Sequence, residues 1–335
     1  HFTYFGFRYV RVTGLDEVNL AHFRAGVIHS DLPVTGSLTT SSPKVNRLIQ
    51  NAFWGQIGNF LDVPTDCPQR DERMGWTGDA HVFAPTASFN MYTPAFYHKY
   101  LYDMVLSQRL LEGAVPHVVP DAINQISRVL GEELTHFGSC AWGDAAAGIP
   151  WTLYQFYGDK ALLAQHYENM KRWADWIIRQ DERNCGARRL WLCGFHYADW
   201  LALDNPVRKS TFGGTDPYFV ASSYYYYSIL LTARAAQALG QKEDQRRYLA
   251  LAEEIKAAFH QEFFTPTGRI AVPTQTALVL ALAFELVPEA HRERAKKDLR
   301  ERIKARNWHL DTGFVGTYLI CRVLSENGMS DIAYT

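Results

Sequence analysis

The residues best suited to carry out chemistry lie in one stretch, TDCPQRDERMGWTGDA, at positions 65–80. Its charged residues are Asp66, Arg70, Asp71, Glu72, Arg73 and Asp79, and Trp76 lies among them. Pro64 and Pro68 disfavour a helix here, so we expect a charged loop. Hydrolysis of a glycosidic bond needs two carboxyl groups: an acid with a raised pKa protonates the leaving oxygen, and a second carboxylate activates water or attacks. An indole beside them offers a flat face for a sugar ring.

The same charge pattern has a simpler explanation, because runs of charged residues are usually solvated, salt-bridged surface loops. Three features favour a functional loop instead. The stretch is poor in flexible Ser and Lys, it places a tryptophan beside carboxylates, and it leads directly into the apolar, small-residue segment TGDAHVFAPTA. We therefore predict that residues 65–80 hold the acid of a carbohydrate-hydrolysing site.

Two further segments combine aspartate with tryptophan at the ends of expected helices. CAWGDAAAGIPW contains Trp142 and Asp144, and FHYADWLALD contains Asp199, Trp200 and Asp204. Aromatic platforms for apolar sugar faces, with carboxylates for hydroxyl groups, are typical of a carbohydrate cleft. Ordinary core packing is the alternative for the two tryptophans, and helix capping is the alternative for Asp144 and Asp204.

Other polar residues near these segments receive simpler roles. His196 is the one histidine in a candidate site loop, and we assign no histidine to catalysis. TQTA at 274–277 and TGFVGT at 312–317 are expected to cap and pack helices. Their location at the mouth of the fold is a secondary inference.

Composition and charge exclude several classes of partner. The 335 residues include 34 basic and 35 acidic side chains, which give a net charge of −1 without a long block of either sign. Nucleic acid binding therefore has no electrostatic support. No apolar run approaches the roughly 20 residues that span a bilayer, so no membrane partner is expected. The expected partner is a carbohydrate substrate, and the oligomeric state stays open.

The five cysteines are scattered and odd in number, which favours free thiols and hence the cytoplasm, with a secreted form left open. Cys185 and Cys193 are close enough in sequence for a local bridge, but we expect them to be reduced. The sequence has no CxxC pair and no HExxH motif, so no metal site is predicted.

The N-terminal residues differ in pattern from the rest. Residues 2–28 alternate aromatic or β-branched side chains with polar ones around Gly14, which predicts two strands. Two strands cannot bury a face alone. We therefore interpret residues 1–35 as the remnant of a preceding β-domain.

From residue 36 to residue 335 the sequence predicts a mainly α domain. Ser41 or Ser42 can cap the first helix, and Pro43 suits its first turn. Further helices are expected at about 77–90, 93–112, 141–157, 160–181, 217–239, 242–262, 273–285, 289–305 and 312–327.

Several of these helices form pairs with different surfaces. SSYYYYSILLTARAAQAL and TQTALVLALAFEL are largely apolar, and each precedes a charged amphipathic helix. A helix that is apolar on all sides is buried, whereas one with a charged face lies outside, so the order predicts a barrel of about five helical hairpins and the first helix of a sixth. An open solenoid follows the same hairpin logic, but its repeats keep one length and signature, which these do not.

The strings DVPTDCPQRDERMGWTGDA, WGDAA, FHYADWLALD, TQTA and TGFVGT occur in order along nearly the whole chain. Together they resemble the catalytic domain of bacterial α-L-rhamnosidases, glycoside hydrolase family 78. The opening FTYFGFRYVRVTG resembles the end of the β-domain that precedes the barrel in that family. The resemblance implies an (α/α)6 barrel that removes terminal α-L-rhamnose with inversion of the anomeric configuration.

Carried over to the matching positions, the resemblance also implies roles for residues. Glu72 would be the general acid. The predicted substrate-binding residues are Asp66, Arg70, Trp76, Asp79, Trp142, Asp199 and Trp200. No cofactor is implied, because acid and base are both side chains.

The resemblance places the general base in a glutamate motif beyond the helix that follows TGFVGT, and this sequence ends at Thr335 before such a motif. An inverting pair needs carboxyl groups about 6.5–9.5 Å apart with a water molecule between them. We therefore expect the base to lie outside this sequence and the last hairpin to be incomplete. Two alternatives stay open: a non-catalytic carbohydrate-binding fragment, and an (α/α)6 glycosidase that acts on another sugar.

Overall fold

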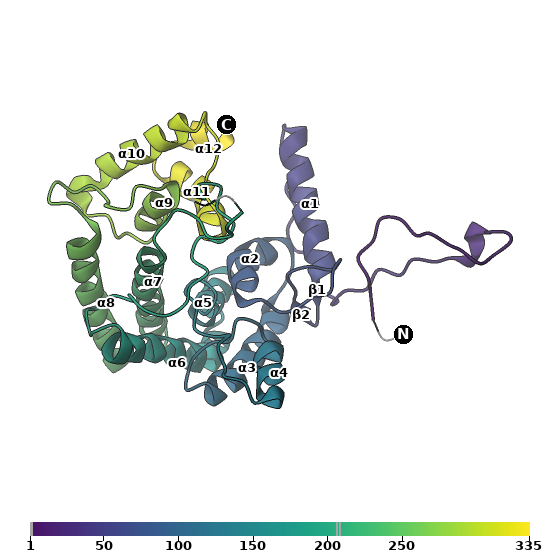
Figure 1. The fold of residues 1–335 in the computed structure, drawn as a ribbon, viewed down its shortest axis with the longest axis horizontal. Helices are drawn as coiled ribbons and strands as arrows, with labels where there is room; N and C mark the ends of the chain where they lie inside the picture. The colour runs from purple at the N-terminus through teal and green to yellow at the C-terminus, as the bar shows by residue number, and fades with distance from the viewer. Residues whose placement is uncertain (1–2, 206, 208) are drawn as a thin grey trace.

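Helices dominate the computed structural model, which describes residues 3–205, 207 and 209–335 (Figure 1). The longer helices are α1 (Pro43–Asn59), α2 (Thr77–Asn90), α3 (Pro94–Leu110), α5 (Ala145–Tyr157), α6 (Lys160–Asn184), α7 (Pro217–Ala238), α8 (Lys242–Phe263), α9 (Gln275–Ala283), α10 (Arg292–Ala305) and α11 (Phe314–Glu326). Shorter elements are η1 (Leu20–His22), α4 (Ala122–Leu130), η2 (Glu289–His291), α12 (Ser330–Tyr334) and the paired strands β1 (Phe60–Leu61) and β2 (Val63–Pro64). Within these described residues, no helix is both long and apolar enough to cross a membrane.

Burial divides the helices into an inner and an outer layer. Every residue from Gln275 to Leu282 in α9 is buried. By contrast, α10 buries only Ala295, Leu299 and Ile303, the apolar stripe of an otherwise charged helix. The inner helices α2, α5, α7, α9 and α11 contact one another in that order, while α6, α8, α10 and α12 each pack against inner helices. The predicted alternation of inner and outer helices is confirmed.

The inner helices curve into a ring. Trp142, just before α5, and Phe314, the first residue of α11, stack with ring centroids 4.7 Å apart and planes inclined by 27°. Two inner helices, α7 and α9, lie between α5 and α11 in the order of contacts. A straight row of hairpins would hold Trp142 and Phe314 apart, so an open solenoid does not describe this fold.

Local capping explains where several helices begin. The Ser42 side chain accepts a hydrogen bond from the amide three residues later, and Pro43 occupies the first turn of α1, as predicted. Asp216 caps α7 in the same way, and Pro217 is the first residue of that helix. These short-range contacts fix helix starts from residues adjacent in sequence.

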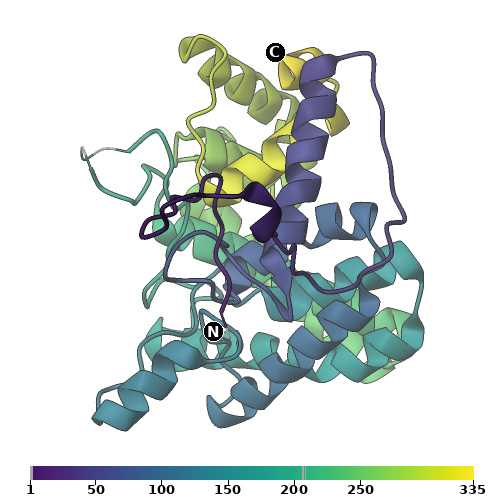
Figure 2. The same cartoon turned by 90° about the vertical axis from the view of Figure 1, so that its right-hand side faces the viewer.

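The sequence did not predict α4, which lies at the edge of the molecule (Figures 1 and 2). Its buried residues are polar, Asn124 and Ser127, whereas Ile126 and Val129 are exposed. Apolar periodicity normally marks the face that a helix buries. In α4 that relation is inverted: its apolar residues recur at helical spacing, so the sequence carries the signal of a helix, but the face that they form is the exposed one.

The N-terminal segment corrects an expectation. Residues 3–28 form no strand, and their one regular element is η1. Figures 1 and 2 show the segment as an extended ribbon that leaves the helices. Phe5 is 68% exposed and Tyr9 is 88% exposed, because no described part of the chain covers the alternating side chains. The prediction of two strands is wrong here, and the assignment of 1–35 to a preceding β-domain remains a prediction.

Candidate active site

Hydrogen bonds close residues 66–76 into a loop without helical turns, as predicted. The Asp66 N–H donates to Met74 O at 3.1 Å, and Asp66 Oδ1 accepts from the Met74 N–H at 3.0 Å. Arg70 bridges two carboxylates, with Nε 2.8 Å from Glu72 Oε2 and Nη2 3.2 Å from Asp66 Oδ2. One guanidinium group therefore sets the relative position of Asp66 and Glu72.

Both carboxylate oxygens of Glu72 are held. Oε2 faces Arg70, and Oε1 accepts a hydrogen bond from Trp76 Nε1 at 2.9 Å. The Glu72 side chain is nevertheless 32% exposed. A carboxyl group that is oriented on two sides and still open to solvent is placed to exchange a proton with a ligand.

Asp79 lies in the first turn of α2, close to this loop. Burial, together with the negative charges of Asp66 and Glu72, raises the pKa of Asp79 to about 6. Asp66 and Asp79 line the same cavity, of about 270 Å³, between α1 and α2. The structure thus brings together three carboxylates that the sequence grouped, and one of them is protonated far more readily than an ordinary aspartate.

The predicted tryptophans meet around a residue that we did not predict. The Tyr197 ring lies 6.0 Å from Trp76, 4.6 Å from Trp142 and 5.4 Å from Trp200, measured between ring centroids. Its hydroxyl group lies 3.0 Å from His117 Nδ1. The position of Tyr197 inside the FHYADW motif was the available signal for this role.

Trp142 forms the back of this aromatic wall. It is only 3% exposed, and it is enclosed by Tyr197, Phe314 and the Cα of Gly78. Its Nε1 is buried and has no hydrogen-bond partner among the described residues. The core-packing alternative therefore applies in part to Trp142, which supports the aromatic wall from behind. Trp76 and Trp200 are the more exposed members of the wall.

Asp199 does not fit its predicted role as a sugar ligand. It is 1% exposed, and its Oδ1 accepts from Val315 N–H at 3.0 Å and from Gly316 N–H at 3.1 Å. Its Oδ2 accepts from Gly313 N–H at 2.8 Å and from the Thr276 hydroxyl. With both oxygens saturated at the N-terminus of α11, Asp199 positions that helix and has no free acceptor for a sugar hydroxyl.

The helix-capping alternative is wrong for both Asp144 and Asp204. Asp144 lies at the start of α5 but makes no side-chain capping bond there. Its carboxylate accepts from Ala141 N–H, from Trp173 Nε1 at 2.9 Å and from the Ser228 hydroxyl, and burial raises its pKa to about 6. Asp204 accepts from Gly214 N–H at 2.8 Å and so braces the long connection before α7.

His196, near the wall, has a structural role. His196 Nδ1 accepts from Cys140 N–H, and its Nε2 donates to Cys193 O, each at 3.1 Å. Burial lowers the pKa of His196 to about 4, so the ring is neutral at neutral pH. With both ring nitrogens bonded, His196 has no free nitrogen for proton transfer.

Cys185 and Cys193 form a disulfide, with Cα atoms 5.4 Å apart, which corrects the expectation of reduced thiols. The bond closes the turn after α6 and precedes the aromatic segment 195–200 directly. Cys67 and Cys140 are free and buried, and Cys321 is free and exposed. The cysteine argument for the cytoplasm therefore loses its support.

Asp66, Cys67 and Glu72 offer ligand atoms within 4.8 Å of one another. Arg70 already occupies both carboxylates, and burial raises the pKa of the Cys67 thiol, which favours its protonated form. The chemistry of this set suits a bridged carboxylate pair better than a bound cation.

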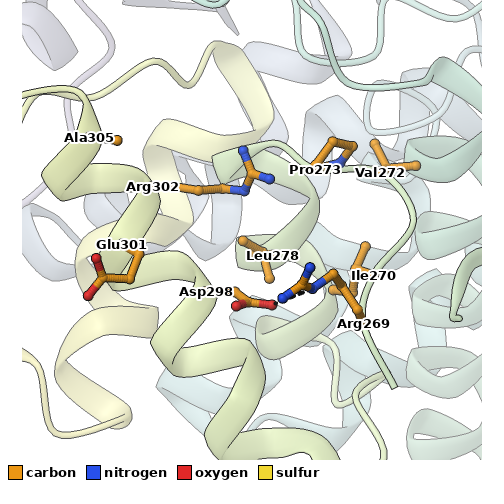
Figure 3. Close-up of a pocket in the computed structure, with 9 residues that line it drawn as sticks. All are labelled: Arg269, Ile270, Val272, Pro273, Leu278, Asp298, Glu301, Arg302 and Ala305. Carbon is orange, nitrogen blue, oxygen red and sulfur yellow. Dashed lines mark ion pairs between the residues drawn. The ribbon is translucent and has the colours of Figure 1, made fainter. Parts of the chain in front are cut away.

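A separate cavity of about 390 Å³ lies between α10 and the segment before α9 (Figure 3). Arg269 and Asp298 face each other there, with Nε and Oδ2 3.6 Å apart. None of the predicted site residues lines this cavity. We therefore do not include it in the candidate active site.

A family model described as the bacterial alpha-L-rhamnosidase 6 hairpin glycosidase domain matches residues 33–335. Relatives include an α-L-rhamnosidase of Formosa agariphila and one of Streptomyces avermitilis, each 38% identical over 99% of this chain. The chain covers 34% and 30% of these two relatives, so it spans about a third of their length.

Solved structures agree with this match. The native α-L-rhamnosidase of Aspergillus terreus has a TM-score of 0.83 at 36% identity, with 91% of this chain and 34% of that chain covered. The Streptomyces avermitilis α-L-rhamnosidase complexed with L-rhamnose has a TM-score of 0.80 at 37% identity, with 91% and 27% covered. The predicted fold class, a barrel of helical hairpins, is confirmed.

Proposed function

Since this chain belongs to the bacterial α-L-rhamnosidase six-hairpin glycosidase family, we propose that it is the catalytic domain of an enzyme that hydrolyses terminal α-L-rhamnosides. One structural observation supports the assignment of this activity to particular residues. Arg70 ties Asp66 and Glu72 together, beside the easily protonated Asp79 and under the aromatic wall of Trp76 and Tyr197.

In this proposal Glu72 is the general acid. It gives its proton to the glycosidic oxygen as the bond between that oxygen and the anomeric carbon breaks. Water adds to the anomeric carbon and loses one proton to the general base. Arg70 and Trp76 hold the two Glu72 oxygens and so fix the direction of proton transfer. Asp66, Arg70 and Asp79 bind sugar hydroxyls, and Asp79 can donate as well as accept a hydrogen bond when protonated. Inversion, and a base outside this sequence, remain predictions from the resemblance.

Glu72→Gln tests the acid, because glutamine keeps the shape of the side chain but has no acidic proton to give. We expect kcat on methyl α-L-rhamnoside to fall about 10²–10⁴-fold. The loss on a nitrophenyl α-L-rhamnoside is expected to be smaller, because nitrophenolate leaves without protonation. Glu253→Gln, on the exposed face of α8, is the matched control and is expected to keep full activity.

Undiminished turnover by Glu72→Gln would refute the assignment. If only Asp79→Asn loses activity, and its kcat falls more on methyl than on nitrophenyl α-L-rhamnoside, the general acid is Asp79. Calorimetric titration with L-rhamnose separates binding from turnover: binding without hydrolysis of any substrate would favour the carbohydrate-binding alternative.

The sugar and the stereochemistry are tested on the same protein. A panel of aryl α-L-rhamnosides, glucosides and glucuronides distinguishes a rhamnosidase from a glycosidase of other specificity. Proton NMR during turnover identifies the first anomer released. Release of the β-anomer from an α-rhamnoside is expected, and the α-anomer would contradict inversion.

A further inference from the structure

Two aromatic side chains beside the candidate site are exposed. Phe195 is 53% exposed and Phe212 is 42% exposed, although both belong to the connection between α6 and α7 that also carries the buried Asp199. Their ring centroids lie 6.2 Å apart with planes inclined by 84°. Two perpendicular rings of this kind present an apolar corner to solvent.

The corner is held in place by the backbone. Phe212 pairs with Trp200 in an isolated β-bridge, and the Leu201 N–H donates to Thr211 O at 2.7 Å. The disulfide between Cys185 and Cys193 closes the chain just before Phe195. A surface fixed at both ends needs little ordering when a ligand binds, which favours binding.

A cavity of about 320 Å³ opens at this corner. Its lining includes Gly194, Phe195, Phe212, Gly213 and Pro217 and contains no charged side chain. The one titratable side chain in the lining, His196, is neutral and has both ring nitrogens bonded. The volume lies at the lower end of the range for small-molecule sites, about 300–1,000 Å³. An apolar cavity of this size suits an uncharged ring.

A row of aromatic rings connects the corner to the proposed acid. Trp76 donates to Glu72 Oε1 at 2.9 Å, and its ring lies 6.0 Å from Tyr197. Tyr197 in turn lies 5.0 Å from Phe195, and Trp200 lies 5.2 Å from Phe212. The acid protonates the oxygen that stays with the leaving group, so the leaving group lies on the side of the sugar that faces the acid.

We propose that Phe195 and Phe212, with Trp200 packed against Phe212, bind the leaving group of the substrate, and that this group is a ring with an apolar face. The inference rests on the proposed function. Both a sugar ring, through its C–H face, and a planar phenolic ring have the required chemistry. Other exposed aromatics, such as Phe89 at the far end of α2, are not part of the row that ends at Glu72.

The test compares Phe195→Ala and Phe212→Ala with the wild type on three substrates. Methyl α-L-rhamnoside has no ring in its leaving group, a rhamnosyl-glucose disaccharide has a sugar ring, and a phenolic α-L-rhamnoside has a planar ring. Each variant is compared with the wild type on the same substrate, so differences in leaving-group reactivity cancel. Phe89→Ala is the matched control, because Phe89 is 69% exposed and lies away from the site.

For ring-bearing substrates we expect kcat/KM to fall about 3- to 10-fold in each variant, the scale of one aromatic contact. For methyl α-L-rhamnoside we expect no more than a twofold change, and for Phe89→Ala no change on any substrate. A fall on the disaccharide alone identifies a sugar ring as the preferred occupant, and a fall on the phenolic substrate alone identifies a planar ring. Equal effects on all three substrates, or no effect on either ring-bearing one, would overturn the inference.

Failure of the proposed function gives a different result. If the wild type cleaves none of the three rhamnosides, calorimetric titration with the same compounds still tests the surface. Ring-bearing rhamnosides that bind more weakly to Phe195→Ala and Phe212→Ala than to Phe89→Ala would support it, and equal affinities would overturn it. Thermal unfolding of the variants checks that these exposed substitutions leave the fold intact.

Discussion

Gly78 is the point at which the start of α2 contacts the aromatic wall, and Gly78→Ala tests whether that wall is rigid. A Cβ atom placed on Gly78 lies 2.7 Å from Trp142 Cδ2 and Cε2 and 2.8 Å from Nε1. The indole cannot retreat, because Tyr197 and Phe314 lie against it with ring centroids 4.6 and 4.7 Å away. The new methyl group must therefore displace the ring or the helix.

Two opposing effects set the size of the change. Overpacking of a filled interior costs about 1–3 kcal/mol, and contact with three atoms of a confined ring indicates the upper half of that range. Alanine in a helix recovers about 0.5–1 kcal/mol relative to glycine. We therefore expect the free energy of unfolding to fall by about 1–2.5 kcal/mol in Gly78→Ala.

Gly55→Ala in α1 is the matched control, because a Cβ atom there meets nothing within 4 Å. This variant keeps the helix-propensity gain without the contact, so its stability is expected to rise by about 0.5–1 kcal/mol. Urea unfolding followed by tryptophan fluorescence measures both changes. Equal stability of the two variants would refute the rigidity of the wall.

Activity gives an independent readout of the same contact. We expect Gly78→Ala to lower kcat/KM on all rhamnosides, because a displaced Trp142 shifts Tyr197 against the sugar site. Glu253→Gln, on the exposed face of α8, is the control for activity and is expected to leave kcat/KM unchanged. A loss of stability with unaltered turnover would refute the link between Trp142 and the proposed sugar site.

Three further predictions concern buried groups. Asp199→Asn turns an NH2 group toward the backbone donors of α11, so we expect the free energy of unfolding, measured with urea, to fall by about 2–4 kcal/mol. A change within about 0.5 kcal/mol would contradict the role of Asp199 in holding that helix. The pKa of Asp79 is about 6 in the folded chain against a usual 3.8, so its contribution to stability is complete below about pH 4 and is lost as the pH rises through 6. We therefore measure the difference in free energy of unfolding between Asp79→Asn and the wild type at two pH values, and expect it to shift in favour of the variant between pH 4 and pH 7. A difference that does not change with pH would argue against the raised pKa. Cys185→Ser opens the disulfide-closed loop, so we expect its free energy of unfolding to fall by about 2–3 kcal/mol. Reductant is expected to lower the free energy of unfolding of the wild type by the same amount. A wild type whose stability does not respond to reductant would contradict the disulfide.

Helix positions could be predicted from the sequence because their signals are local. The expected helix at 77–90 coincides with α2, and that at 217–239 ends one residue beyond α7. Ser42 and Pro43 mark the start of α1 by contacts within one turn. The strand prediction failed for residues 3–28, because their alternating pattern has no sheet to complete. The helix α4 was missed although its apolar residues recur at helical spacing, and the face that it buries is the polar one.

The sequence by itself determined the helical hairpins and the residues of the charged loop, because Asp66, Arg70, Glu72 and Trp76 are neighbours along the chain and their contacts need only a turn. Only the tertiary structure decided which other residues join them. Asp199 meets its donor at Gly313 across 114 positions, so its carboxylate holds a helix instead of a sugar. Tyr197 becomes the centre of the aromatic wall because the fold brings Trp142, just before α5, against Phe314 at the start of α11, and Tyr197 packs on Trp142. Contacts at such separations depend on how the hairpins close. The order of inner and outer helices predicts a barrel, but it does not predict which side chains the barrel brings together.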